Sequence, residues 1–240
     1  MARHPHGKII HSVRDQFGLI QVVETADTRS LYFNSLVEQS RAYLYAPCTL
    51  AFEYQASLLE AILDFSNKAP VERVLMLGLG GGCLATQLHL LMPNCLQILV
   101  EQRAAVIEIA HQYFQLPNNE VILPIEADAG VFVKEWPDQA ETAFDVIVID
   151  LYDSDSMPFQ FAQELFLSQL ARLVSLQGCL LFNLWVSTPE KTKRVIRFWQ
   201  NLPGVTLNIQ TMKVTGNVIL NVQFGQAKHR IAAKNPSRDK

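Results

Sequence analysis

Short apolar runs alternate with longer amphipathic segments through the middle of the chain. The apolar runs cover residues 73–77, 96–100, 121–125, 146–149 and 178–184. Each is short and largely apolar along its whole length, which is typical of strands buried on both faces of a parallel sheet. The pattern therefore predicts an α/β fold in which helices cover both faces of a mostly parallel sheet.

The segments around these runs carry apolar residues at spacings of three and four, which predicts amphipathic helices. The helices are expected over residues 50–65, 84–91, 104–114, 129–136, 161–174 and 189–201. After the last helix, residues 205–212 and 217–224 are joined through Thr215 and Gly216, and they predict a terminal antiparallel hairpin.

The two ends of the chain differ from this alternating region. Residues 17–24 and 29–33 are rich in β-branched and aromatic residues, and Ala26 and Asp27 form a turn signal between them. A small N-terminal β-hairpin subdomain is therefore expected. We predict three parts, namely a β-hairpin subdomain (1–49), an α/β domain that carries the ligand site (50–225) and a basic, flexible tail (226–240).

Composition narrows the classes of function. Hydrophobic residues make up 49% of the chain and charged residues 18%, which is typical of a globular protein. The net charge of −3 gives no general attraction to nucleic acid or to an anionic membrane, and no apolar run has the length of a membrane span. We therefore expect neither partner. The four cysteines form no C-x-x-C pair and the N-terminus has no apolar leader, so we expect reduced thiols and a cytoplasmic location.

A glycine-rich turn follows the first apolar run. The sequence VLMLGLGGG carries a buried strand into Gly78, Gly80, Gly81 and Gly82, and a helix follows. Glycines here allow a tight turn and the close approach of a ligand, so we expect Gly78, Gly80 and Gly82 to contact one. A dinucleotide fingerprint would place glycine where this chain has Cys83, so a ligand without phosphates fits equally well. We favour ligand binding over a purely structural turn.

Two acids follow at the ends of later strands. Glu101 closes the second apolar run, nineteen residues after Gly82, where a ribose diol can donate two hydrogen bonds to its carboxylate. Asp128, followed by Ala129, ends the next strand-and-loop unit, where its carboxylate can accept from an adenine amino group. Asp128 is equally well placed to cap the helix that follows, and both interpretations stay open.

Acids also cluster after the fourth run, in DVIVIDLYDSDSMP. Asp150, Asp153 and Asp155 stand at the carboxyl end of this strand, where open α/β sheets bind their ligands. Three neighbouring carboxylates repel one another unless a cation shares the site, and a sulfonium or an amine would supply that cation. We predict functional roles for Asp150 and Asp153 and a loop position for Asp155. The histidines show no metal-ligand spacing on one helix face, so no metal site is expected.

These motifs resemble those of the spermidine synthase family of aminopropyltransferases, which share the class I methyltransferase fold. The family's glycine loop reads GGGDGG, an acid ends its second strand, and its fourth strand ends in D-S-S-D-P. Residues 78–83, Glu101 and residues 150–153 occupy those places here. The segment LYFNSLVEQS resembles the family's L-x-L-D-G-x-x-Q hairpin and places Gln39 near its ligand-binding glutamine. The resemblance covers residues 31–223.

The resemblance implies a Rossmann-like sheet, a homodimer, and S-adenosylmethionine or its decarboxylated form as co-substrate, with a small-molecule amine or another small acceptor as partner. It implies that Glu101 binds the ribose and that Asp128 and Ala129 lie at the adenine. It also implies that Asp150 takes the proton of the attacking amine and that Asp153 anchors this amine.

Three departures from the family pattern fall at positions that it uses for the amine. Gly81 replaces the acid of GGGDGG, and Ala56 replaces the glutamate of the Y-H-E or Y-Q-E motif that begins at Tyr54. The family's P-x-Y-P-S-G segment is reduced to MKVTG at residues 212–216. We therefore expect the nucleoside side of the site to be kept and putrescine to bind poorly.

Three functions remain open on these grounds. The pair Asp150 and Asp153 favours transfer of an aminopropyl group to an amine. Gly81 favours methyl transfer from S-adenosylmethionine to a small molecule, because the full ligand has a carboxylate that an acid there would repel. The third is a non-catalytic protein that binds an adenosyl ligand.

Overall fold

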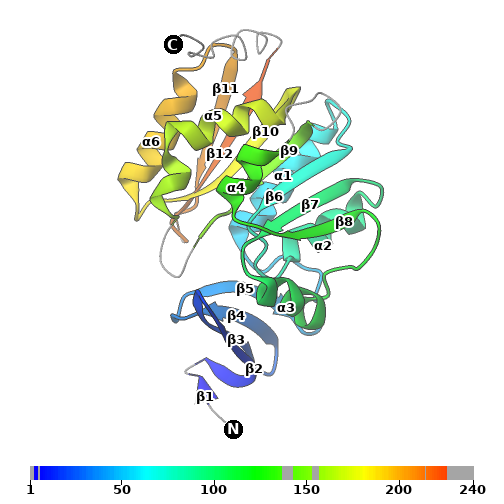
Figure 1. Ribbon diagram of the computed structural model, residues 1–240. Helices are drawn as coiled ribbons and strands as arrows, with labels where there is room; N and C mark the ends of the chain where they lie inside the picture. The colour runs from blue at the N-terminus through cyan, green and yellow to red at the C-terminus, as the bar shows by residue number, and fades with distance from the viewer. Residues whose placement is uncertain (1–2, 5, 137–142, 153–156, 214, 226–240) are drawn as a thin grey trace.

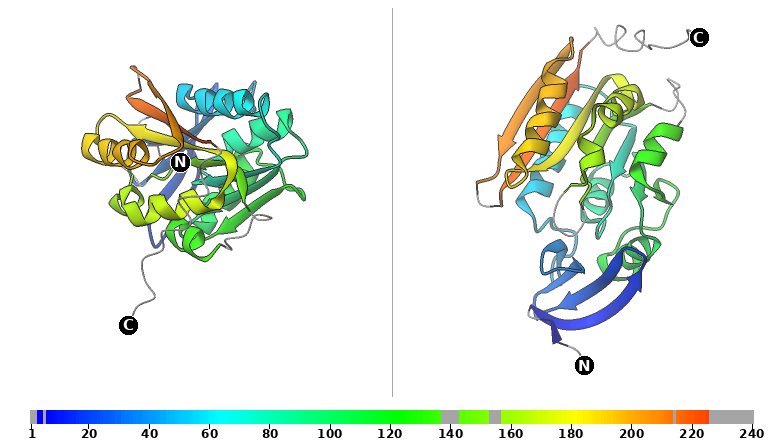
Figure 2. Two further views of the ribbon diagram at one scale, coloured as in Figure 1. Left: turned by 90° about the horizontal axis from the view of Figure 1, so that it is seen from above. Right: turned by 60° about the vertical axis from the view of Figure 1, so that its left-hand side comes forward.

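The computed structural model describes residues 3–4, 6–136, 143–152, 157–213 and 215–225. It contains a five-stranded sheet near the N-terminus and a seven-stranded sheet formed by the rest of the chain. Figure 1 shows the small sheet, in blue, at one end of the large one. Seen from above in Figure 2, helices cover both faces of the large sheet. The predicted α/β class is confirmed, whereas the predicted tail (226–240) lies outside the described residues.

The seven strands of the large sheet follow the order β11-β12-β10-β9-β6-β7-β8. Their bounds are β6 Arg73–Leu77, β7 Leu96–Glu101, β8 Ile122–Glu126, β9 Phe144–Ile149, β10 Val174–Trp185, β11 Val205–Thr211 and β12 Asn217–Phe224. Strands β8, β7, β6, β9 and β10 run parallel, and β12 pairs antiparallel with both β10 and β11, as predicted for the terminal hairpin. The chain moves outward from β6 to β8 and then returns to β9 on the other side of β6. A ligand crevice is expected where this order reverses, at the carboxyl ends of β6 and β9.

The helices agree with the predicted segments except in one place. They are α1 Glu53–Ser66, α2 Cys83–Leu91, α3 Ala104–Phe114, α4 Ala129–Glu135, α5 Glu164–Leu173 and α6 Pro189–Gln200. The helix expected over 161–174 is divided into a 3-10 turn, η2 (Phe159–Ala162), and α5, because Gln163 between them is extended, with φ −83° and ψ 147°. None of the helices in the described part of the chain combines the length and the apolar character that a bilayer crossing requires.

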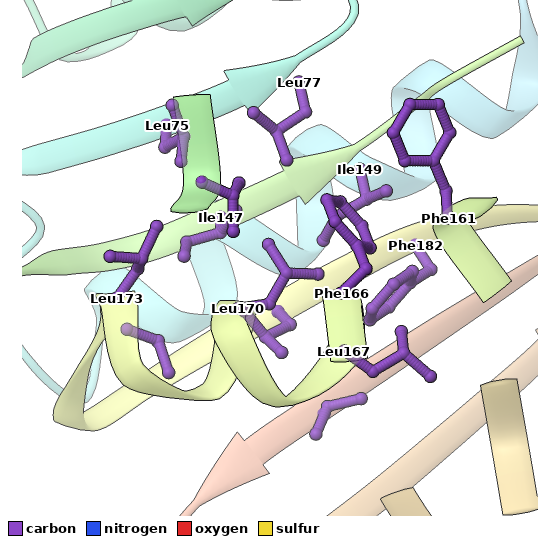
Figure 3. Close-up of a cluster of buried hydrophobic side chains, with 14 of the residues drawn as sticks. Leu75, Leu77, Ile147, Ile149, Phe161, Phe166, Leu167, Leu170, Leu173 and Phe182 are labelled. Atoms are coloured by element: carbon purple, nitrogen blue, oxygen red, sulfur yellow. The ribbon is translucent and has the colours of Figure 1, made fainter. Parts of the chain in front are cut away.

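Apolar side chains are buried on both faces of the large sheet. On one face, α4, α5 and α6 cover the sheet, and Figure 3 shows Phe166 and Leu170 of α5 next to Ile147 and Ile149 of β9. On the other face, Leu58 of α1 and Leu88 of α2 are fully buried. Burial of one such leucine contributes about 1.5–3 kcal/mol, which explains why apolar runs of only four to seven residues specify strands here.

The N-terminal sheet extends the predicted hairpin to five strands. The hairpin is present as β3 (Gly18–Glu24) and β4 (Thr28–Phe33), and β1 (Arg3–His4), β2 (Gly7–Asp15) and β5 (Glu38–Tyr43) add to it in chain order. Strands β2 and β5 mix apolar residues with charged and polar ones and lie toward the edges of the sheet, so apolar content alone does not reveal them. Ile20 and Leu31 of the sheet pack with Val106 and Phe114 of α3.

A partly buried ion pair joins this sheet to the large domain. Arg103, 5% exposed, precedes α3 and donates through Nε and Nη2 to the two carboxylate oxygens of Asp15, both at 2.8 Å. Its Nη2 also donates to the carbonyl of Gly18 at 3.1 Å, and its guanidinium lies 4.8 Å from the ring centre of Phe33. The sheet is thereby held next to the end of β7, where Glu101 lies.

Candidate active site

A cavity of about 260 Å³ lies where the strand order reverses. Residues from β5, the start of α1, the β6–α2 loop and the carboxyl ends of β7, β9 and β10 line it. The structure brings most of the predicted site residues to this cavity, namely Gln39, Gly78, Gly80, Glu101, Asp128, Ala129 and Asp150. Gly82 is not among the lining residues, and Asp153 and Asp155 lie outside the described residues.

The glycine loop turns tightly between β6 and α2. Leu77 and Ile149 are register partners in the sheet, so Gly78 and Asp150 follow side by side. Gly78 has φ 92°, and a Cβ there would lie 2.1 Å from the backbone oxygen of Asp150. A Cβ on Gly80, at φ 53°, would lie 2.7 Å from Ser40 Oγ. Only glycine therefore allows β5 and the strand end at Asp150 to approach this loop.

The other two loop glycines, Gly81 and Gly82, pack against protein side chains and do not line the cavity. Gly82 is the left-handed N-cap residue of α2, at φ 72°, and a Cβ there would meet Leu116 at 2.9 Å. A Cβ on Gly81 would lie 2.9 Å from the ring of Phe114 and 3.0 Å from Ser40 Cβ, and the Gly81 N–H donates to Ser40 Oγ at 2.7 Å. Gly81 does not line the cavity, so its replacement of the family's acid gives no support to a ligand with a carboxylate.

Glu101 forms a rigid, buried carboxylate at the end of β7. It is 8% exposed, and its two oxygens accept from the backbone N–H of Leu79 at 3.3 Å and of Arg103 at 3.0 Å. Burial raises its pKa, and these N–H groups together with the charge of Arg103 oppose the rise. Each oxygen can accept a second hydrogen bond, so the geometry is compatible with two ribose hydroxyls, and the ribose role of Glu101 stays a prediction.

Asp128 caps α4 while it lines the cavity. Its Oδ1 accepts from the backbone N–H of Val131 at 2.9 Å, which confirms the capping interpretation. The adenine interpretation stays a prediction and is compatible with the cap, because a carboxylate has a second oxygen. Ala129, 5% exposed, lies beside Asp128 at the cavity wall.

Asp150 receives a hydrogen bond on each carboxylate oxygen. Tyr54 Oη of α1 donates to Oδ2 at 3.1 Å, and Asn183 Nδ2 of β10 donates to Oδ1 at 2.8 Å. Burial raises the pKa of Asp150, and these two hydrogen bonds oppose the rise. Burial and the nearby charge of Asp150 raise the pKa of Tyr54 well above its ordinary value, so Tyr54 stays a neutral donor.

Several residues around Asp150 belong to none of the predicted motifs. Asn183 and Asn217 interrupt buried strands with an amide, and this was the available signal because buried polar side chains require partners. Tyr152 and Trp185 stack with ring centres 4.8 Å apart, and Tyr152 Oη donates to the carbonyl of Asn183 at 2.9 Å. Ala56, in contrast, is exposed on α1 and does not line the cavity, so the expected loss of an acid there removes nothing from this site.

No family profile matches this sequence, but individual curated relatives do. The polyamine aminopropyltransferase of Neisseria meningitidis serogroup A is 29% identical over 206 residues, which cover 85% of this chain and 74% of the relative. The polyamine aminopropyltransferase of Chromobacterium violaceum is 27% identical over 183 residues, which cover 76% of this chain and 67% of the relative.

Solved structures show the same fold. A probable spermidine synthase from Corynebacterium glutamicum has a TM-score of 0.78 at 19% identity, with 90% of this chain and 80% of that chain covered. A spermidine synthase in complex with the transition state analogue AdoDATO has a TM-score of 0.68 at 16% identity, with 93% and 74% covered. Human methyltransferase-like protein 13 in complex with SAH has a TM-score of 0.61 at 20% identity, with 78% and 94% covered.

The fold is therefore the Rossmann-like fold that spermidine synthases and methyltransferases share. Within this class, the chain is similar over most of its length to the polyamine aminopropyltransferases, so the resemblance predicted from its motifs is confirmed. The relatives are named as transferases, in agreement with the predicted class of enzyme.

Proposed function

We propose that this protein transfers the aminopropyl group of decarboxylated S-adenosylmethionine to a small-molecule amine. The similarity to curated polyamine aminopropyltransferases supports this type of reaction. The observation that carries the choice of co-substrate is the charge of the cavity. Glu38, Glu101, Asp128 and Asp150 line it, and no lysine or arginine occurs in its described lining.

This charge distribution favours cationic ligands. Decarboxylated S-adenosylmethionine carries a sulfonium and an ammonium group, which an acidic cavity stabilises. S-adenosylmethionine would add a carboxylate without a described cation to pair with it, and an unpaired buried charge is costly. Glu38 is partly neutralised by its ion pair with Arg41, whereas Asp150 receives its two hydrogen bonds from neutral groups and keeps its charge available.

Asp150 is suited to accept the proton of the attacking amine. A protonated amine has no lone pair, so it must lose a proton before its nitrogen can bond to the aminopropyl carbon. As the new C–N bond forms, the C–S bond breaks and its electron pair goes to sulfur, which leaves methylthioadenosine. Tyr54 and Asn183 hold the carboxylate in place, and burial raises its pKa toward the range of a working base.

Methyl transfer from S-adenosylmethionine is the second candidate. The supporting observation is similarity to the eEF1A lysine and N-terminal methyltransferase of Xenopus laevis, 28% identical over 117 residues. That match covers 46% of this chain and 17% of the relative, less than the aminopropyltransferase matches do. The acidic cavity also suits the full ligand less well.

Calorimetry with decarboxylated S-adenosylmethionine, S-adenosylmethionine and methylthioadenosine tests the co-substrate. We expect the first and third to bind with a Kd of about 1 μM or lower, and the second at least about tenfold more weakly. Release of methylthioadenosine is then measured with putrescine, a longer diamine and a monoamine as acceptors. Gly81 and Ala56 do not line the cavity, so the expected weak binding of putrescine depends on the altered segment 212–216, whose Thr215 does line it.

Two matched variants test the proton acceptor. Asp150→Asn should lower turnover about a hundredfold or more and change the affinity for methylthioadenosine little. Asp145→Asn, at the opposite end of β9, should leave turnover unchanged, because Asp145 does not line the cavity and accepts from the backbone N–H groups of Glu72 and Arg73. Tight binding without release of methylthioadenosine for any amine would refute the proposal and favour the non-catalytic function.

We infer a homodimer from the resemblance to spermidine synthases and a cytoplasmic location from the cysteines, all free, of which Cys83, Cys95 and Cys179 are buried. Sedimentation velocity tests the first inference, and thiol titration of the protein isolated without reductant tests the second. A monomer at cellular concentration or oxidised cysteines would contradict them.

A further inference from the structure

A chain of hydrogen bonds reaches Asp150 from the antiparallel part of the sheet. Asn217 Nδ2, at the start of β12, donates to Asn183 Oδ1 on β10 at 2.8 Å. Asn183 Nδ2 in turn donates to Asp150 Oδ1 at 2.8 Å. Asn217 is 5% exposed and Asn183 is 3% exposed. The two residues are diagonal neighbours on adjacent strands, since Asn183 pairs with Ile219 and Asn217 pairs with Trp185.

The chemistry of the three groups determines the direction of these hydrogen bonds. A carboxylate only accepts, so Asn183 must present its NH2 group to Asp150. The amide oxygen of Asn183 then points away from Asp150 and requires a donor, which Asn217 supplies. If this donor were absent, the Asn183 amide could turn and present its oxygen to the carboxylate, where two acceptors would repel.

We propose that Asn217 is a positioning residue that acts through Asn183 to hold the Asp150 carboxylate ready to accept a proton. This inference rests on the proposed function, in which Asp150 is the base. The relay adds two residues, Asn183 and Asn217, that are distant from Asp150 in the sequence and do not belong to the acidic motif after β9. Because Asn217 starts β12, it also makes the placement of the base depend on the β11–β12 turn, whose Thr215 lines the cavity.

The groups around Asp150 allow its titration to be followed. Tyr54 on α1 and Tyr152 after β9 both have a raised pKa, and Cys83, close to Tyr54, has its pKa raised to about 12 by burial. These groups therefore stay neutral while Asp150 titrates. Among the cavity acids, Glu101 and Asp128 are held by backbone N–H groups and have no part in the Asn217 relay.

The test measures the titration of Asp150 directly, in the full chain, by NMR of aspartate side chains labelled with ¹³C. The Asp150 signal is assigned by its loss in Asp150→Asn. Asn217→Leu keeps the approximate size and removes the amide, and Asn217→Ala removes it without added bulk in case the leucine is not accommodated. Asn221→Leu is the matched control, because Asn221 lies four residues further along β12 on the same face and does not line the cavity.

We expect both Asn217 variants to titrate Asp150 at higher pH than the wild type, and Asn217→Gln, which keeps the NH2 donor, to remain close to the wild type. Asn221→Leu should leave the titration unchanged. In turnover, the acid limb of the kcat/KM profile should move to higher pH by about one pH unit, with activity about tenfold lower on that limb and regained at pH values above it. A structural defect alone would lower activity equally at every pH.

The relay is refuted if folded Asn217→Ala and Asn217→Leu titrate Asp150 as the wild type does. This result can be told apart from failure of the proposed function, because the NMR titration requires no turnover. Wild-type aminopropyl transfer with an unchanged titration would refute only the relay. A shifted titration in a protein without aminopropyl transfer would refute the proposed function and leave the relay in place.

Discussion

Replacement of Glu101 by glutamine gives the sharpest test of the nucleoside site. Both carboxylate oxygens of Glu101 already accept from a backbone N–H, at 3.3 and 3.0 Å, so the side chain cannot turn to compensate for a change in one oxygen. Glu101→Gln turns one acceptor into a donor and removes the charge. At least one charge-assisted hydrogen bond to the ribose is lost, which is worth about 1.5–3 kcal/mol.

A loss of this size corresponds to a tenfold to hundredfold weaker affinity, to order of magnitude. Calorimetry with methylthioadenosine measures it, and Glu126→Gln is the matched control, because Glu126 is the register partner of Glu101 on β8 and is exposed. The 2′,3′-dideoxy analogue of methylthioadenosine lacks both ribose hydroxyls, so it should bind the wild type and Glu101→Gln about equally. Combining the change in the ligand with the change in the protein forms a double-mutant cycle that isolates this contact.

Stability should change little in this variant. The pKa of Glu101 is raised in the folded protein, chiefly by burial, so its ionised form carries a folding penalty that is present above the folded pKa and absent below its ordinary value of 4.5. A neutral glutamine does not carry this penalty, which offsets the loss of the backbone hydrogen bond at the oxygen that the NH2 group replaces. If Glu101→Gln binds methylthioadenosine as tightly as the wild type, the ribose assignment is wrong.

Three further outcomes follow from the structure. First, turnover should fall as the pH falls through the raised pKa of Asp150, because only the ionised carboxylate accepts a proton; a pH profile without an acid limb above the ordinary value of 3.8 would contradict this. Second, Arg103→Met should lower the free energy of unfolding by about 2–4 kcal/mol in urea titrations at neutral pH. Burial of Asp15 raises its pKa, but the hydrogen bond and charge of Arg103 and backbone N–H groups outweigh burial and hold this pKa below 3.8. The stabilisation by the ion pair is therefore present above pH 3.8 and is lost as the pH falls through the pKa of Asp15 in the folded protein. If the free energy of unfolding differs between wild type and Arg103→Met by the same amount below the folded pKa of Asp15 as at neutral pH, the ion pair is not the source of the stabilisation. Third, Gly78→Ala should lower the melting temperature and abolish binding of methylthioadenosine, because its Cβ would lie 2.1 Å from the Asp150 carbonyl oxygen. Wild-type binding by this variant would show that the loop can move aside.

The local pattern of the sequence was sufficient for most of the fold. Largely apolar runs of strand length predicted β6, β7, β9 and β10, because a strand covered on both faces has few polar positions. The same patterns placed Glu101 and Asp150 at strand ends, and parallel strands bring such ends to one edge of the sheet. These site positions could be predicted because each depends on a residue and its immediate neighbours.

Other features depend on contacts between segments that are distant in the chain. The strands β2 and β5 are held by pairing with their neighbours in the N-terminal sheet. Gly81 packs against Ser40 and Phe114, neither of which is near it in the sequence, and this contact keeps it away from the cavity. The amide relay joins Asn217, Asn183 and Asp150 only because β12 inserts antiparallel next to β10. The sequence by itself determined the parallel sheet, the glycine loop and the acids at its edge, since burial and backbone conformation are local requirements. Which side chains hold those acids, and which glycines face the cavity, was decided by the tertiary structure, because hydrogen-bond partners are selected by distance in space.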